Sequence, residues 1–343
     1  MTVSSVKTGD DGYNLNVTNV SWSINLGNFA AGRAIRAGGQ APSPTNVIDY
    51  FFIPTLGNAT DFGDLLNSIF RLANGSCGSN TRAIFAGGST SSGDTHPNTP
   101  LNTTVNVIQY VTIASTGNAT DFGDLSVAKN ALGSFSSSTR GIFAGGENSS
   151  DNQNTIEYIT IASTGNVTDF GDLANGIRQV GGAASPTRGM VGGGVFSGVY
   201  RDTISYVTIS STGNSTNFGS LTVARGNIGS LSNNTRALWF GGISQSGPPI
   251  NTIDYVTIAS TGNALDFGDL INTPTSWSPP GVYDMNGTSN STRGVIVGGS
   301  DGNVTNIIQY VTIGSTGNAA DFGDLTISVQ ASGATSSAHG GLS

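Results

Sequence analysis

The sequence predicts an all-β protein, a six-bladed β-propeller with four antiparallel strands in each blade, closed by its C-terminal strand. Three observations predict this fold class. A unit that averages 52 residues, measured from Tyr50 to Tyr310, recurs six times. Glycine accounts for 50 of the 343 residues, which favours many tight turns, and no window shows the apolar spacing of a helix. Because such repeats bury one continuous core, we expect a single propeller at residues 26–343, preceded by an N-terminal arm at residues 1–25.

Each repeat contains three parts in a fixed order. An arginine opens a short apolar stretch that ends in Gly-Gly, an Ile-x-Tyr segment follows, and Thr-Gly-Asn-x-x-Asp-Phe-Gly-Asp-Leu completes the unit, with Asn217-Phe218-Gly219-Ser220 as one departure. The arginines are Arg33, Arg82, Arg140, Arg188, Arg236 and Arg293. The tyrosines are Tyr50, Tyr110, Tyr158, Tyr206, Tyr255 and Tyr310. The phenylalanines are Phe62, Phe122, Phe170, Phe218, Phe267 and Phe322.

These repeated residues are expected to build the scaffold, because they occur in every blade. We expect the arginines to hydrogen-bond to neighbouring blades, the phenylalanines to pack between blades, and the acids beside each phenylalanine to cap main-chain donors of a turn. In the third repeat, with strands lettered a to d, strand b is expected at residues 139–146, strand c at 155–163 and strand d at 167–173, followed by strand a at 174–186. These strands are apolar on both faces, as befits a blade that lies between two others.

The two ends of the chain predict how the ring closes. Residues 326–341 align without a gap to residues 126–141, which contain a strand a and its turn, and no strand b follows them. The first recognisable element near the N-terminus is instead a strand b at residues 32–39. We therefore expect the C-terminal strand to complete the first blade, which leaves no open sheet edge. A competing closure uses residues 19–31 as that strand.

Composition excludes several function classes. The net charge is −8 with only 13 Lys and Arg, too few for a nucleic-acid surface. No apolar stretch is long enough for a transmembrane helix, and residues 1–13 lack the apolar core of a secretion signal, so we expect no membrane insertion. The single cysteine, Cys77, is expected to be a small core residue.

Acidic and histidine residues do not form a catalytic pattern. Of 21 acids, ten lie in the Asp-Phe-Gly-Asp copies, three (Asp49, Glu157 and Asp254) precede the repeated tyrosine, and the rest are scattered. The only histidines are His96 and His339, and we expect His339, in the closing turn, to be structural. We therefore expect no catalytic residue, no cofactor and no metal site, and no enzyme activity. Calcium binding by the repeated Asp pairs stays open as an alternative.

Non-repeated loops are where a binding site is expected. The b-to-c connection takes 22 residues from Gly88 to Tyr110, against 11 to 13 elsewhere, and the d-to-a connection takes 23 residues from Leu270 to Arg293, against 15 to 17. Both connections emerge on one face of an antiparallel blade. We predict that this face binds a ligand through His96, Trp277, Tyr283 and Asp284. The alternative is that Trp277 and Tyr283 only fix their loop to the ring.

The repeat resembles known families. Its period and Gly-Gly doublet resemble the kelch repeat, and the run at residues 110–125, followed by residues 138–146, resembles tandem repeats in structural proteins of marine bacteriophages, especially cyanophages. The resemblance implies a virion protein of a tail, fibre or capsid surface, assembled in the host cytoplasm. It also implies host attachment through a surface glycan or protein, with the arm binding other virion proteins. The alternatives are a cytoplasmic kelch-type interaction scaffold and, less favoured, a carbohydrate-active enzyme.

Overall fold

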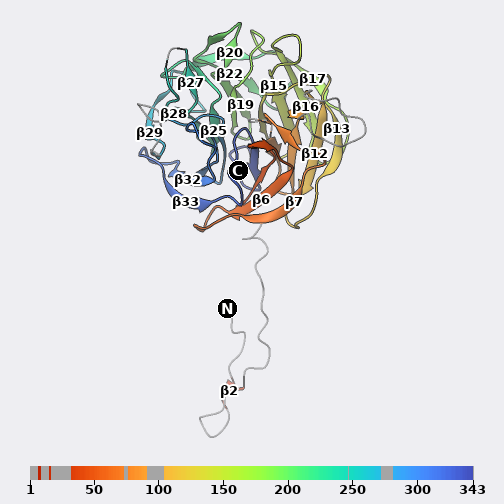
Figure 1. The fold of residues 1–343 in the computed structure, drawn as a ribbon, viewed down its shortest axis with the longest axis vertical. Coiled ribbons are helices and arrows are strands. Elements are labelled where there is room, and N and C mark those ends of the chain that lie inside the picture. The colour runs from red at the N-terminus through yellow and green to blue at the C-terminus, as the bar shows by residue number, and fades with distance from the viewer. Residues whose placement is uncertain are drawn as a thin grey trace.

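The computed structural model describes residues 32–72, 76–90, 104–245, 247–271 and 281–342, together with two short paired strands, β1 (Lys7–Thr8) and β2 (Leu15–Asn16). Six four-stranded antiparallel sheets surround a central axis (Figure 1). The described residues form strands and turns without a helix, and so without a helical membrane span. The predicted all-β, six-bladed propeller is confirmed.

Each blade contributes its four strands in the order a to d from the axis outwards. The first blade contains β34 (Gly333–Ser336), β3 (Arg33–Ala37), β6 (Val47–Phe52) and β7 (Thr60–Asp64). The second contains β9 (Ser76–Gly78), β10 (Arg82–Ala86), β12 (Val107–Thr112) and β13 (Thr120–Asp124). The third contains β14 (Gly133–Ser136), β15 (Arg140–Ala144), β16 (Thr155–Thr160) and β17 (Thr168–Asp172).

The remaining blades repeat the pattern. The fourth contains β18 (Gly181–Ala184), β19 (Arg188–Gly192), β22 (Thr203–Thr208) and β23 (Thr216–Ser220). The fifth contains β25 (Gly229–Ser232), β26 (Arg236–Phe240), β28 (Thr252–Thr257) and β29 (Leu265–Asp269). The sixth contains β30 (Asn286–Ser289), β31 (Arg293–Val297), β32 (Ile307–Thr312) and β33 (Ala320–Asp324).

Short paired strands lie in the connections between the strands of these sheets. They are β4 (Gln40–Ala41) with β5 (Ser43–Pro44), β8 (Ile69–Phe70) with β11 (Ser89–Thr90), β20 (Val195–Phe196) with β21 (Val199–Tyr200), and β24 (Arg225–Gly226) with β27 (Ile243–Ser244).

The C-terminal strand closes the ring as predicted. In the β3–β34 ladder, Ala34 lies opposite Ser336 and Ala37 lies opposite Gly333. The other edge of β3 pairs with β6, so no edge of β3 remains for the competing closure. Residues 19–31, which that alternative uses, lie outside the described residues. The chain therefore ends near the middle of the ring (Figure 1).

The inner strands are shorter than the sequence suggested. Strand a was expected at residues 174–186, but β18 covers only Gly181–Ala184. The chain cannot be extended before this strand because Gln179 has a φ of 59°, in the left-handed region. Residues 174–180 therefore form a loop, and the expected strands b, c and d also end within a few residues of the observed ones.

The turn between strands c and d docks on the outer strand of the preceding blade. Gly165 N–H, in the Thr-Gly-Asn turn of the third blade, donates to Phe122 O at 2.7 Å, and Asn166 Oδ1 accepts from Asp124 N–H at 3.0 Å. The other five junctions repeat both bonds. The expectation that the repeated Asp carboxylates cap the turn is therefore wrong: the caps run from the Asp main chain to the Asn side chain.

Close docking explains the glycine of Asp-Phe-Gly. A Cβ on Gly268 would lie 2.6 Å from Gly317 O in the next turn, and its φ of 146° also disfavours a side chain. A β-bulge precedes this point in every blade; in the second, Gln109 pairs with Asp121 while Ile108 pairs with Gly123, so Phe122 is the extra residue. The bulge turns the phenylalanine inward, where it is buried and packs edge-on against the repeated tyrosine.

The repeated arginines connect consecutive blades. Each guanidinium lies 3.8–4.7 Å from the centre of the repeated tyrosine ring and donates through Nη1 to an isoleucine carbonyl of the next blade at 2.5–2.9 Å. Apolar clusters fill the same junctions; one joins Ile48 and Phe62 of the first blade to Phe85 and Val111 of the second. The core thus lies between blades.

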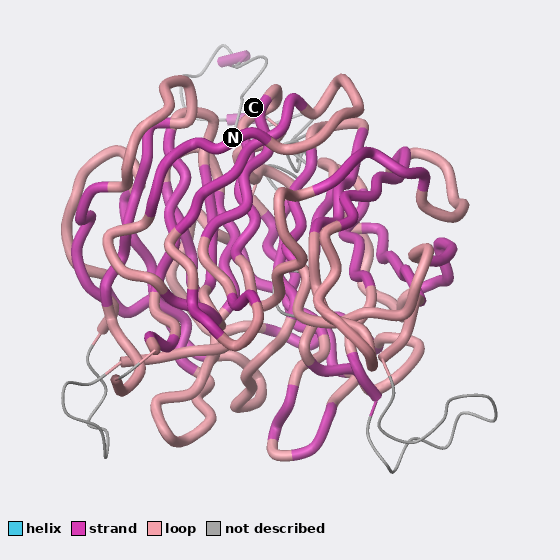
Figure 2. The backbone as a smooth tube through the Cα atoms, turned by 90° about the horizontal axis from the view of Figure 1, so that it is seen from above, coloured by secondary structure: helices cyan, strands magenta, loops and turns pink. Residues whose placement is uncertain are grey.

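In the view at right angles to Figure 1, the strands run between two faces of the ring (Figure 2). The b-to-c and d-to-a connections share one face, since Glu147, from a b-to-c connection, forms ion pairs with Arg71 and Arg178, from two d-to-a connections. We call this face the loop face.

Candidate ligand-binding site on the loop face

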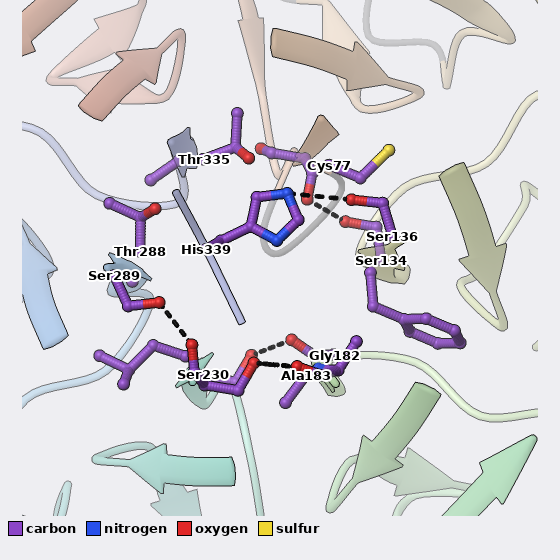
Figure 3. A pocket seen from close by; sticks show the side chains of 17 residues that line it. Cys77, Ser134, Ser136, Gly182, Ala183, Ser230, Thr288, Ser289, Thr335 and His339 are labelled. Atoms are coloured by element: carbon purple, nitrogen blue, oxygen red, sulfur yellow. Dashed lines mark hydrogen bonds between the residues drawn. The ribbon is translucent and has the colours of Figure 1, made fainter. Parts of the chain in front are cut away.

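The central channel is lined by hydroxyl groups, but most of them hold the blades together. Ser136 Oγ donates to Gly78 O at 2.8 Å across a blade junction. Ser230 Oγ donates to Gly182 O at 2.8 Å across another junction (Figure 3). The space left is about 50 Å³, enough for a few water molecules. The channel therefore has no room for a larger ligand.

His339 reaches into this channel after the closing strand (Figure 3). Its Nε2 lies 3.0 Å from Gly78 O, and its Nδ1 accepts from Gly341 N–H at 3.2 Å. Burial lowers the pKa of the imidazole to about 4, and the hydrogen bond that the ring donates to the Gly78 carbonyl opposes this change. The neutral ring thus fixes the C-terminal turn to the second blade. Cys77 is also buried here, and burial raises the pKa of its thiol, which stays protonated.

At the loop face the channel is narrowed by a ring of left-handed residues, one from each d-to-a connection, with φ between 52° and 59°: Arg71, Ala131, Gln179, Asn227, Asp284 and Ala331. Five main-chain hydrogen bonds of 2.7–3.1 Å link each N–H to the carbonyl of the preceding member. The small space beside them, about 40 Å³, receives the side chains of Arg71, Gln179, Asn227 and Asp284. We call this feature the axial ring.

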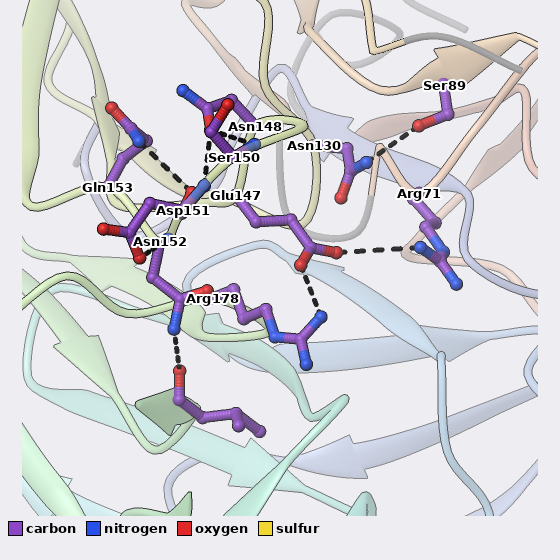
Figure 4. Close-up of polar contacts among 11 residues, drawn as sticks. Arg71, Ser89, Asn130, Glu147, Asn148, Ser150, Asp151, Asn152, Gln153 and Arg178 are labelled. Atoms are coloured by element: carbon purple, nitrogen blue, oxygen red, sulfur yellow. Dashed lines mark hydrogen bonds and ion pairs between the residues drawn. The ribbon is translucent and has the colours of Figure 1, made fainter. Parts of the chain in front are cut away.

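Asp284 is the charged acid of the axial ring. Desolvation raises its pKa to about 6, and the nearby Arg71 guanidinium opposes the change. Arg71 itself is half-exposed and lies 3.6 Å from Glu147, which also pairs with Arg178 (Figure 4). One carboxylate therefore pairs with arginines of two d-to-a connections, those that follow the first and the third blade, and holds these loops together.

A larger cleft of about 410 Å³ opens beside this network, between the second and third blades. Its walls are Phe70, Arg71, Ser89, Thr90, Thr104, Asn130, Asn148 and Ser149. We call it the blade 2–3 cleft. Local pairing places its walls: β8 lies antiparallel to β11, so Phe70 faces Ser89, while Asn130 pairs with Glu147.

Two buried polar atoms of this cleft have no hydrogen-bond partner, namely Thr90 Oγ1 and Asn130 Oδ1. The amide of Asn130 is held in place because its Nδ2 donates to Ser89 Oγ at 2.8 Å (Figure 4). An unpaired buried hydroxyl or amide oxygen costs about 1–3 kcal/mol of stability. Both atoms are therefore candidate hydrogen-bond partners for a polar ligand in the cleft.

The residues that the sequence singled out are not gathered at one place. His96 and Trp277 lie outside the described residues. Tyr283 is half-buried, and its main chain pairs with Ser300 through bonds of 3.0 and 2.9 Å. Asp284 lies in the axial ring, apart from the walls of the blade 2–3 cleft.

Sequence reasoning missed Phe70, Thr90 and Asn130. Phe70 and Asn130 occupy equivalent positions of their repeats, where the others have Arg178, Gly226, Tyr283 and Gln330. Such variation at one repeat position was the available signal, but it does not reveal which side chains border an open space.

No protein-family model matches this sequence, and no curated protein matches it either. Within the described ranges, no group of three or more His, Cys, Asp or Glu side chains could hold a metal ion.

Proposed function

We propose that this protein is a non-enzymatic binding scaffold of a phage particle, a tail, fibre or capsid-decorating propeller that binds a host-surface carbohydrate through its loop face. The observation that carries the binding role is the pair of unpartnered buried atoms, Thr90 Oγ1 and Asn130 Oδ1, in a cleft of about 410 Å³.

The composition of the cleft favours a hydroxyl-rich ligand. Hydroxyls and amides line most of it, the Arg71 guanidinium adds donors, and Phe70 adds a partly buried aromatic ring. Sugars present hydroxyls that both donate and accept, together with an apolar ring face that packs on aromatic side chains. Sugar hydroxyls can pair with Asn130 Oδ1 and Thr90 Oγ1, which would offset the cost of keeping these atoms unpaired.

The particle role rests on the sequence. The long repeat at residues 110–125 resembles those of cyanophage structural proteins, and only 10% of the residues are charged. Residues 1–25 would bind other virion proteins, leaving the loop face free for the host. Mass spectrometry of purified particles tests this: detection is expected, and absence from particles would favour a cytoplasmic kelch-type scaffold.

The binding role is tested by glycan-array binding with matched variants. Thr90→Val keeps the shape of the side chain and removes the unpaired hydroxyl, so it should stabilise the free protein by about 1 kcal/mol while lowering glycan affinity. Asn130→Ala should lower affinity at least tenfold. Gln153→Ala, on the same face but outside the cleft, is the control.

Two results would overturn the carbohydrate proposal. One is an array with no bound glycan at high protein concentration, and the other is a bound glycan whose affinity is unchanged in Thr90→Val and Asn130→Ala. Analysis of the glycan after incubation tests the alternative of a carbohydrate-active enzyme, since a shortened or altered glycan would indicate catalysis.

A further inference from the structure

Five of the six blade junctions are filled by one side chain, that of the residue preceding the repeated tyrosine. In two junctions it is a glutamine: Gln109 Oε1 accepts from Leu66 N–H at 2.8 Å, and Gln309 Oε1 accepts from Ile271 N–H at 2.9 Å. Both donors follow the leucine that ends strand d of the preceding blade. The side chain thus satisfies the first N–H of each d-to-a connection.

In three junctions the same position holds an acid. Glu157 accepts from Ser126 N–H at 3.2 Å, Asp254 accepts from Thr222 N–H at 3.1 Å, and Asp49 accepts from the hydroxyl of Thr326. Each acid is buried, and each has a buried cation as its partner. The pairs are Asp49 with Arg36, Glu157 with Lys129, and Asp254 with Arg225.

Because both members of each pair are buried, each charge needs its partner. Desolvation lowers the pKa of Arg36, Lys129 and Arg225, and in each case the neighbouring carboxylate opposes this change. Where the acid is replaced by Gln109 or Gln309, the neighbouring loop position holds Ile69 or Val282 instead of a cation. Each of these five junctions therefore contains either an acid with its cation or neutral side chains at both positions.

The junction between the third and fourth blades lacks this filling. The residue before Tyr206 is Ser205, the loop position of Lys129 is taken by Ile177, and that of Arg36 by Val191. All three side chains are short, and they line a cavity of about 290 Å³. We call it the blade 3–4 cavity. Across the described residues, no side chain accepts a hydrogen bond from Ala174 N–H, whereas at four other junctions the acid or amide accepts from the equivalent N–H.

An unpaired cation lines the same cavity. The Arg201 guanidinium lies 5.3 Å from the centre of the Phe196 ring, and both side chains belong to the walls. Within the described ranges no carboxylate and no carbonyl lies against this guanidinium, whereas every other arginine of the chain contacts one or the other. The cavity thus has a donor-rich rim and apolar inner walls, including Leu173.

We propose that the blade 3–4 cavity binds the carboxylate of an aliphatic acid, which takes the place that Asp or Glu occupies in other junctions. The carboxylate accepts from Ala174 N–H and from the hydroxyls of Thr203 or Ser205, and it pairs with Arg201. The methylene groups pack on Leu173, Ile177 and Val191. This site goes beyond the proposed function and does not depend on it, because it is lined by different residues from the blade 2–3 cleft.

Two sources supply such a ligand, a free acid and an acidic side chain of another protein. The probes are therefore propionate and N-acetylglutamate amide, with propionamide as the uncharged control, and binding is followed by chemical-shift changes in the full-length protein. We expect both acids to shift the signals of Ala174 and Ser205 with at least tenfold higher affinity than propionamide. Tighter binding of N-acetylglutamate amide would indicate a protein partner, and tighter binding of propionate would indicate a free acid.

Two variants place the effect in this cavity. Arg201→Gln removes the charge and should weaken acid binding at least tenfold. Ser205→Glu supplies an internal carboxylate and should abolish binding while raising the melting temperature, an outcome that misfolding cannot produce. Gln153→Ala should change nothing.

Equal affinity for propionate and propionamide, or acid binding unaffected by Arg201→Gln and Ser205→Glu, would overturn the proposal. Glycan binding by the Ser205→Glu variant distinguishes the two sites, since loss of acid binding should leave it unchanged.

Discussion

The side chain of Arg293, in the last blade, donates a hydrogen bond of 2.7 Å to the main-chain oxygen of Ile53, in the first blade. The bond crosses the closure of the ring, yet it is the same bond that Arg140 makes to Ile209 within the continuous array. The closing junction therefore has the contacts of an ordinary junction, and the first blade is completed by β34 without a special joint.

Replacing one repeated arginine should weaken one junction. Arg140→Ala removes a charge-assisted hydrogen bond and the contact with the Tyr158 ring, so the free energy of unfolding should fall by about 2 kcal/mol. Urea unfolding measures the change. Arg201→Ala, which removes an arginine without such a bond, is the control and should cost about 0.5 kcal/mol or less. Equal losses in the two variants would contradict this role.

The buried pair Lys129–Glu157, with Nζ 2.7 Å from Oε2, should show strong coupling. Glu157→Ser leaves a buried cation without its partner and should cost about 3–5 kcal/mol. Adding Lys129→Ile removes the unpaired cation, as Ile177 does at the blade 3–4 cavity, and should recover about 2 kcal/mol of that loss. A double-mutant cycle by chemical denaturation measures this coupling. Additive losses would mean that charge matching is not what fills the junction.

His339 should make the folded state sensitive to mild acid. Its pKa is about 4 in the folded protein, below the 6.5 of an exposed histidine, so the unfolded chain takes up the proton first as pH falls. Its contribution is complete above pH 6.5 and declines by up to about 3 kcal/mol as pH drops towards 4. His339→Gln keeps a donor and an acceptor and should remove this slope in thermal unfolding at several pH values. The same slope in His339→Gln, or its loss in His96→Gln, would assign it elsewhere.

Asp284 should act in the opposite direction. Its pKa of about 6 lies above the 3.8 of an exposed aspartate, so the protonated folded state is favoured at low pH, and the contribution is lost as pH rises through 6. Asp284→Asn should therefore stabilise the protein at pH 7 by about 2 kcal/mol and have little effect near pH 4. Asn227 adopts the same φ of 54° in the equivalent position, so asparagine fits there. Asp151→Asn, at an exposed acid, is the control for the unfolding measurements.

The scaffold could be predicted from the sequence because the same motif occurs six times. The spacing of Tyr50 to Tyr310 revealed the blades, and the ungapped match of residues 326–341 to residues 126–141 indicated the closing strand. The role of the aspartates in Asp-Phe-Gly-Asp was misjudged, because the main-chain N–H of the second aspartate, rather than a carboxylate, binds the turn of the next blade. A residue that contacts the next repeat recurs with the same period as a residue that contacts its own repeat, so the sequence does not distinguish the two.

The candidate sites could not be predicted, because they depend on side chains that are shorter than at other junctions and on hydrogen-bond partners that are missing. Ser205 is an ordinary strand residue until Ile177 and Val191 are seen to be equally short at the same junction. Likewise, Thr90 and Asn130 become informative only when their oxygens are found buried without partners. Trp277 and Tyr283 stand out in the sequence as additions to the repeat, whereas the described cavities arise where side chains are short or lack a partner.

Docking of each Thr-Gly-Asn turn on the strand before it has a consequence for how this protein can change. The dock uses main-chain atoms, one asparagine and one glycine, so it accepts any neighbour that carries the same short motif. One blade could therefore be exchanged for another that carries this motif and matching junction charges, together with its exposed loops. Such an exchange would change the side chains of the loop face, while the ring that supports them keeps its geometry.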